Sequence, residues 1–159
     1  MPPIQAAQRT RTTSTRSTGR VDTQLPSRGR GYRVYGQRAR QYGTARTIQT
    51  VQRVAQRYQA RTGKTLEVGT ISQRGGGRIR PHSSHRAGSD LDLRPPSRTG
   101  GPTTWRSSSY DRNATRALIA EIRRENPGAK ILFNDPVLIR EGLVRPYKGH
   151  DNHLHVRLR

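Results

Sequence analysis

The sequence predicts a small α+β domain, an antiparallel sheet flanked by helices, preceded by a basic N-terminal arm. Two amphipathic segments and several short β-branched segments alternate only loosely, without a succession of βαβ units, and this favours an antiparallel sheet. The length of 159 residues suits one domain. Hydrophobic residues make up 29% of the chain. This is too little to bury all of it, so we expect part of the chain to lie outside the core.

Residues 1–43 are predicted to form the arm, and residues 44–159 the domain. The first 43 residues are rich in Thr, Ser, Arg, Gly and Gln and contain hardly an apolar pair. Such a segment cannot bury enough surface to offset the entropy lost on ordering, so we expect a disordered or extended arm. It is either a solvated tail without a specific role or an anchor for polyanions such as teichoic acid or nucleic acid.

Two helices are predicted in the domain, one within residues 44–63 and one within residues 110–126. Gly63 is expected to end the first, and Pro127 with Gly128 to end the second. The apolar positions that share a helical face are Ile48, Val51, Ala55 and Tyr58 in the first, and Ala114, Ala117, Leu118 and Ile122 in the second.

Four strands are predicted, at residues 64–72, 91–94, 130–133 and 153–158. In the last strand, Leu154, Val156 and Leu158 alternate with His153 and His155. Because successive side chains of a strand point to opposite faces, one face of this strand is aliphatic and the other carries imidazoles.

The composition limits the partners and the kinds of site. The formal net charge of +21 favours polyanions such as nucleic acid, an anionic membrane surface or an acidic wall polymer. Cysteine is absent, so any transition metal must be held by His and carboxylate groups, which suits zinc. We see no transmembrane segment and no secretory signal, so we expect delivery by lysis, by injection or in a phage particle.

All five histidines lie in two short stretches. The first, "RPHSSHRAGSDLDLR", also carries Asp90 and Asp92, and the second is "YKGHDNHLHVRLR". Two histidines and one carboxylate from separate segments make a three-ligand zinc site whose fourth position is open to water, which is typical of catalysis. A single histidine more often caps a turn or lies in a core. Five histidines in two stretches favour a metal site.

These stretches resemble those of the penicillin-insensitive murein endopeptidases. The segments "VGTISQRGGGRIRPHSSHRAGSDLDLR" and "GHDNHLHVRL" carry the H-x₆-D and H-x-H pairs of a wider group of metallopeptidases, with the additional His82, His150 and glycines of the narrower family. The wider group includes lysostaphin-type enzymes, D-Ala-D-Ala peptidases and the hedgehog signalling domain. The resemblance covers about residues 45–159 and implies a fold of the hedgehog and D-Ala-D-Ala peptidase type.

The resemblance implies a role for each of these side chains. His85, Asp92 and His155 would ligate one Zn²⁺. His153 would lie beside the metal-bound water, where it takes a proton or stabilises an oxyanion. The remaining predicted site residues are His150 behind the ligands, His82 near the cleft, and Asp90, which orients a ligand histidine or caps the turn. Whether His153 or His150 is the acid/base is left open.

The implied function is a zinc metallopeptidase that hydrolyses peptidoglycan. It would cleave the cross-link between D-alanine and meso-diaminopimelate, in the periplasm or at the cell wall, as a phage lysin or a virion-associated wall-opening enzyme. One alternative is a D-Ala-type carboxypeptidase of the same fold, a choice that depends on the loop at residues 95–110. The other is a basic protein that packs nucleic acid or a virion and keeps a vestigial zinc site. The tyrosines and arginines of "GYRVYGQRARQYG" favour that alternative, because bases stack on such side chains.

Overall fold

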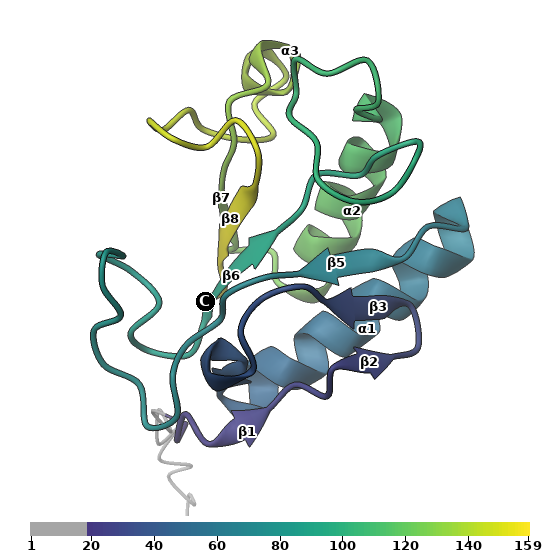
Figure 1. Cartoon of the computed structure of the whole chain (residues 1–159). Coiled ribbons are helices and arrows are strands. Elements are labelled where there is room, and N and C mark those ends of the chain that lie inside the picture. Colours follow the sequence, from purple (N-terminus) through teal and green to yellow (C-terminus); the bar gives the residue numbers. More distant parts are fainter. Residues whose placement is uncertain (1–18) are drawn as a thin grey trace, which may run out of the picture.

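The computed structural model describes residues 19–159 and confirms the α+β class (Figure 1). The main sheet has six strands in the order β2-β3-β5-β6-β8-β7. Their bounds are β2 Arg28–Gly29, β3 Tyr32–Val34, β5 Leu66–Val68, β6 Asp90–Leu93, β7 Lys130–Leu132 and β8 Leu154–Arg157. Neighbouring strands are antiparallel except for β3 and β5, which run parallel. The sheet is therefore mixed, and the expectation of a purely antiparallel sheet is corrected at this pair.

Two long helices form where the apolar periodicity predicts them. Helix α1 spans Ala45–Thr62, and its first turn is capped by Thr44, whose side chain accepts a hydrogen bond from the backbone of Thr47. Gly63, with φ of 73°, ends α1 in the left-handed conformation that glycine adopts most readily. Helix α2 spans Arg112–Glu125 behind an Asp111 cap. A short helix not predicted from the sequence, α3, spans Pro136–Arg140.

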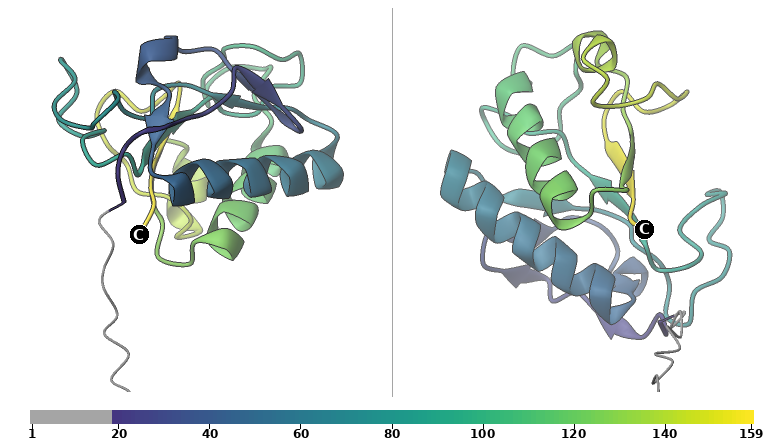
Figure 2. Two further views of the ribbon diagram at one scale, coloured as in Figure 1. Left: turned by 90° about the horizontal axis from the view of Figure 1, so that it is seen from below. Right: turned by 180° about the vertical axis from the view of Figure 1, so that it is seen from behind.

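Helices α1 and α2 lie side by side on one face of the sheet (Figure 2). The aliphatic side chains of the two central strands are buried against them, including Leu91 and Leu93 of β6 and Leu154 and Val156 of β8. Since side chains alternate along a strand, the residues between them point to the opposite face. The fold thus leaves the other face of β6 and β8 for polar residues.

The interpretation of residues 19–43 as a flexible arm is wrong. This segment contains β2 and β3, a 3₁₀ helix at Arg38–Arg40, and the pair β1 (Thr23–Gln24) and β4 (Tyr42–Gly43), which forms a separate two-stranded sheet. Two of its side chains, Leu25 and Tyr32, are almost fully buried in the core. Each strand is only two or three residues long and contains at most one buried residue, so the segment shows no apolar periodicity. The predicted arm remains a prediction for residues 1–18, which lie outside the described residues.

Within residues 19–159, no helix is both long enough and apolar enough to cross a membrane.

Candidate metal centre

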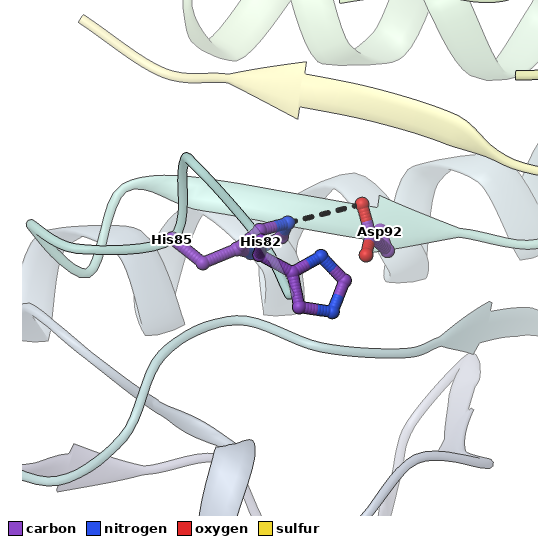
Figure 3. Close-up of side chains that lie close together, drawn as sticks. All are labelled: His82, His85 and Asp92. Atoms are coloured by element: carbon purple, nitrogen blue, oxygen red, sulfur yellow. Dashed lines mark ion pairs between the residues drawn. The ribbon is translucent and has the colours of Figure 1, made fainter. Parts of the chain in front are cut away.

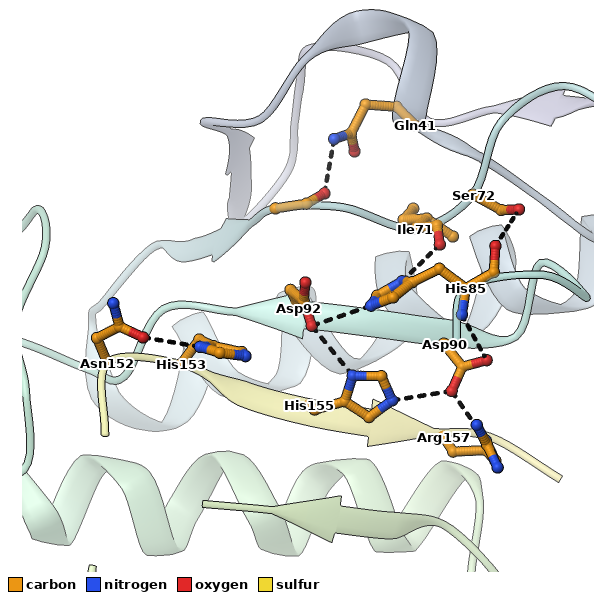
Figure 4. Close-up of polar contacts among 11 residues, drawn as sticks. Gln41, Ile71, Ser72, His85, Asp90, Asp92, Asn152, His153, His155 and Arg157 are labelled. Atoms are coloured by element: carbon orange, nitrogen blue, oxygen red, sulfur yellow. Dashed lines mark hydrogen bonds and ion pairs between the residues drawn. The ribbon is translucent and has the colours of Figure 1, made fainter. Parts of the chain in front are cut away.

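The centre of the site is the pairing of β6 with β8. Asp92 and His155 face each other across the two antiparallel strands, and His155 Nδ1 lies 3.2 Å from Asp92 Oδ1. Both are buried, on the sheet face opposite the helices. Directly opposite residues of neighbouring strands have adjacent Cβ atoms, so the strand register brings these two side chains together (Figure 4).

His85 reaches the same point from the loop that precedes β6. Its backbone has φ of 63°, a left-handed conformation that costs a non-glycine residue about 1–2 kcal/mol. Two contacts hold it there: the His85 amide donates to Asp90 Oδ2 at 3.3 Å, and the hydroxyl of Ser72 donates to the His85 carbonyl at 2.7 Å. Gly88 permits the turn between His85 and the strand, because its φ is 68° and a Cβ would lie 2.8 Å from Val21.

The ring of His85 is fixed with one nitrogen left for a ligand. Nδ1–H donates to the carbonyl of Ile71 at 2.7 Å, so Nε2 carries the lone pair. Nε2 is buried and makes no hydrogen bond among the described residues, although it lies only 3.2 Å from Asp92 Oδ1. A buried lone pair next to a carboxylate oxygen is an arrangement that a cation would stabilise.

Asp90 fixes the ring of His155 in a corresponding way. His155 Nε2–H donates to Asp90 Oδ1 at 2.9 Å, which turns Nδ1 toward Asp92. Arg157 donates to the same Asp90 oxygen at 2.9 Å and balances its charge. A carboxylate that holds the outer nitrogen of a ligand histidine is a common feature of metal sites. Asp90 also accepts a hydrogen bond from the His85 amide, so each of the two roles considered for it, orienting a histidine and capping the turn, has a contact in the structure.

The pKa values show how strongly these groups interact when no metal is bound. Burial lowers the pKa of His155, but hydrogen bonds to Asp90 and Asp92 outweigh burial and raise this pKa to about 9. Burial raises the pKa of Asp92, but contacts with His155 and His85 hold it well below its usual range. The pKa of Asp90 is lowered in the same manner by His155 and Arg157. A metal at Nδ1 of His155 would therefore displace a proton.

His82 lies close enough to belong to the same group. His82, His85 and Asp92 each offer one ligand atom, and these atoms lie within 4.8 Å of one another (Figure 3). The rings of His82 and His85 have centroids 5.2 Å apart. His85 and Asp92 are thus common to two possible ligand sets, and the third member is either His82 or His155. The predicted place of His82, near the cleft, agrees with its half-buried position.

The other two histidines, His150 and His153, lie next to each other near His155. His153 Nδ1–H donates to the side-chain oxygen of Asn152 at 2.8 Å, which leaves Nε2 free. Burial lowers the pKa of His153, so the ring is neutral near pH 7. His150 donates from Nδ1 to the carbonyl of Lys148 at 3.1 Å. Its ring centroid is 4.5 Å from that of His153 and 5.9 Å from that of His155.

Two cavities lie next to this group. One of about 320 Å³ has Asp92, His82, His153, Tyr35 and Arg94 among its lining residues, and we call it the cleft. The other, of about 250 Å³, is lined by His155 and His150 with Ser83, Ser84, Lys130, Leu132, Tyr147 and Arg157. Four of the histidines therefore line the two cavities, two in each, and His85 is fully buried and lines neither.

The donor set fits a zinc ion. His85 Nε2 and His155 Nδ1 each lie 3.2 Å from Asp92 Oδ1, and each imidazole is held through its other nitrogen by an acceptor. Two imidazoles and a carboxylate suit zinc, with no thiolate in the chain.

The sequence could not indicate the carbonyl of Ile71, because every residue has one. It could have indicated Arg94, two residues beyond Asp92 on the same strand face.

Comparison with known proteins agrees with this geometry. The family model described as penicillin-insensitive murein endopeptidase matches residues 16–128, which include the first histidine stretch. The chain belongs to this family. It is also 31% identical, over 166 aligned residues and 84% of its length, to a protein of Haemophilus influenzae named penicillin-insensitive murein endopeptidase. The chain spans 57% of the length of that relative. The murein endopeptidase family predicted from the two stretches is thereby confirmed. Residues 16–43, which the composition assigns to the arm, lie within the family match.

Proposed function

We propose that this member of the murein endopeptidase family is a zinc-dependent peptidoglycan hydrolase that cleaves cross-links of the D-Ala–meso-diaminopimelate type. The observation that carries the proposal is that His85 Nε2 and His155 Nδ1 each lie 3.2 Å from Oδ1 of Asp92, which lines the cleft. Family membership supplies the substrate class, since murein is peptidoglycan. The site of action would be the periplasm or the cell wall. Association with a phage particle stays a prediction.

We assign His155, rather than His82, as the third ligand. His155 is buried and its outer nitrogen is held by Asp90, so its ring is oriented before a metal binds. His82 lies on a loop, is half exposed, and has no hydrogen bond to its ring among the described residues. An oriented ligand loses less entropy on binding than a mobile one. His82 instead lines the cleft, where it can contact substrate.

The chain's own residues then supply the remaining chemistry. When bound, zinc lowers the pKa of a coordinated water toward about 7 and polarises a carbonyl group. His153 is neutral and lines the cleft with Nε2 free, so it can accept a proton as a general base and later return it to the leaving amine. Asn152 holds the ring by accepting from Nδ1. No glutamate is among the described residues that line the cleft, which leaves an imidazole as the base.

The two adjoining cavities favour an endopeptidase over a carboxypeptidase. An endopeptidase must accommodate substrate on both sides of the scissile bond, whereas a carboxypeptidase needs space for only one residue beyond it. Asp92 lines the cleft and His155 lines the other cavity, and these two side chains are in contact. A cross-linked substrate could therefore occupy both cavities.

Digestion of purified sacculi, followed by mass spectrometry of the fragments, tests this proposal. We expect cross-linked dimers to be converted to monomers without loss of terminal D-alanine, and His155→Ala to abolish the reaction. The matched control is His82→Ala, which should retain bound zinc. Release of free D-alanine from uncross-linked stems, with dimers intact, would identify a carboxypeptidase instead. No digestion by zinc-loaded protein would refute a peptidoglycan hydrolase.

A further inference from the structure

Arg94 lies in the cleft without a role in the chemistry described so far. It follows β6 directly, two residues beyond Asp92, so the two side chains lie on the same face about 7 Å apart along the strand. The cleft lining includes Arg94 together with Asp92, His82 and His153. Arg94 is the one arginine or lysine among the described residues that line this cleft.

The guanidinium of Arg94 is held in place before substrate binds. Its central carbon lies 3.9 Å from the centroid of the Tyr35 ring, a stacked cation–π contact. Nη1 donates to Glu67 Oε1 at 3.2 Å. Its side chain is 21% exposed. The group therefore has a fixed plane and still presents an accessible surface to the cleft.

Arg94 shares its acidic partner with a second arginine. The same oxygen of Glu67 also accepts from Arg33, so two guanidinium groups share one carboxylate. A guanidinium carries five N–H donors. Arg94 uses one of them on Glu67 in the described part of the chain. Its other donors suit a second carboxylate, which a guanidinium binds in two-pronged geometry.

We propose that Arg94 recognises a free carboxylate on the substrate carbon that bears the scissile nitrogen. This rests on the proposed function. Diaminopimelate has two amino and two carboxyl groups, and its own stem peptide uses one of each. A cross-link uses the second amino group, so the second carboxyl group stays free on the same carbon as the scissile nitrogen.

The reach of Arg94 agrees with this substrate. Consecutive Cα atoms are about 3.8 Å apart, and a polar contact adds about 3 Å. If the scissile carbonyl of the substrate lies at Asp92 and His155, the next residue of the substrate therefore falls near Arg94, two positions beyond Asp92. Arg157 lines the other cavity, but its guanidinium is already paired with Asp90.

The test compares two cross-linked muropeptide dimers that differ in one group. In one, the diaminopimelate carbon at the cross-link carries a carboxylate, and in the other a carboxamide. Zinc-loaded full-length chain should prefer the acid by about tenfold or more in kcat/KM. Arg94→Gln should remove the preference while zinc content stays unchanged. Arg33→Gln is the matched control, because it removes the other guanidinium on Glu67 and lies outside the cleft. It should keep the preference.

A binding measurement gives a readout that does not depend on turnover. Calorimetry with the zinc-free protein should show tighter binding of the product stem peptide in its acid form than in its amide form, and Arg94→Gln should abolish the difference. The inference is overturned if the unaltered protein cleaves and binds both forms equally. It is also overturned if Arg94→Gln keeps the preference, or if Arg33→Gln loses it to the same extent. If the unaltered protein cleaves neither dimer, the proposed function fails, and the binding comparison alone decides the role of Arg94.

Discussion

His155 and Asp92 are opposite residues of β8 and β6, and their side chains meet with Nδ1 3.2 Å from Oδ1. Their positions are set by strand register, because a slip by one residue would turn both side chains into the aliphatic core. Leu93 and Leu154, the next opposed pair, are both fully buried on the helix-covered face. The packing of the core thus fixes two of the proposed ligands, and His85 is the one supplied by a loop.

The first prediction concerns metal content. His155→Ala should lose most of its zinc, because it removes a ligand from a three-residue set, and zinc binding adds to folding free energy. His82→Ala should keep about one zinc per chain. Elemental analysis of both variants, purified in parallel, checks this. The reverse pattern would make His82 the third ligand, with His85 and Asp92 retained from the other group.

The second prediction separates the two remaining histidines. His153→Ala should keep zinc and lose about 10²–10⁴-fold in turnover, because His153 lines the cleft with a free Nε2 and a general base contributes about that factor. His150→Ala should lose less, since His150 lines the second cavity. Steady-state cleavage of soluble cross-linked dimers measures both. A larger loss for His150→Ala would transfer the acid/base role to that residue.

The third prediction concerns Asp90. Asp90→Asn should weaken zinc binding by about 10–100-fold, because a neutral acceptor holds the His155 ring less firmly. Arg157→Gln is the control, since it removes the other partner of Asp90 without touching a ligand. Chelator competition gives the affinity of both variants. Equal affinities for Asp90→Asn and the unaltered protein would reduce Asp90 to a turn residue.

The histidine stretches could be interpreted from sequence because their information is local. An H-x-H alternation on a strand is expected to place both imidazoles on one face. In the structure His155 lies within β8, and His153 directly precedes it. Helices α1 and α2 were predictable for the same reason, since each buries one continuous stripe of apolar side chains. The hydrogen bond that orients the ring of His85 was not predictable. The carbonyl that holds His85 belongs to Ile71, which is brought near only by the tertiary fold.

The N-terminal segment shows the opposite case. Residues 19–43 contain too few apolar residues for any periodicity, yet β3 pairs with β5 and Tyr35 stacks on Arg94 at the cleft. A two- or three-residue strand cannot form alone, and it is stabilised by contacts distant in sequence. The composition therefore predicted a solvent-exposed arm at residues 19–43, although this segment helps to line the candidate site.

The fourth prediction is a pH dependence of stability, taken from Asp135, away from the metal site. Asp135 is fully buried, and although burial raises its pKa, hydrogen bonds from Arg112 and Tyr110 hold the pKa below its usual value. A carboxyl group with a lowered folded-state pKa stabilises the fold above its unfolded pKa of about 3.9, and this contribution is lost as the pH falls through the folded pKa. Asp135→Asn keeps a helix cap but removes the charge.

The free energy of unfolding of Asp135→Asn should therefore be lower than that of the unaltered protein above about pH 5, and the difference should shrink as the pH falls below about 4. Denaturant titrations at a series of pH values measure it. Glu141→Gln is the control, because Glu141 is an exposed carboxylate paired with Arg116 and contributes little. A difference that stays constant down to pH 2 would mean that Asp135 acts through packing alone.

The last prediction decides where the folded domain begins. Leu25 is fully buried in the core, so Leu25→Ala should lower the free energy of unfolding by about 2–5 kcal/mol, through lost burial and the cavity left behind. Arg28, three residues later, is exposed and has no acidic partner among the described residues. Arg28→Ala should therefore change the free energy of unfolding by less than about 0.5 kcal/mol. Both free energies come from urea titrations of the full chain at one pH and one zinc concentration. If residues 19–43 were a flexible arm, neither substitution would alter stability, and the boundary predicted at residue 43 would stand. A large effect of Leu25→Ala alone would place the start of the domain before β2. A truncation that tests whether the arm binds polyanions should then remove residues 1–18 only.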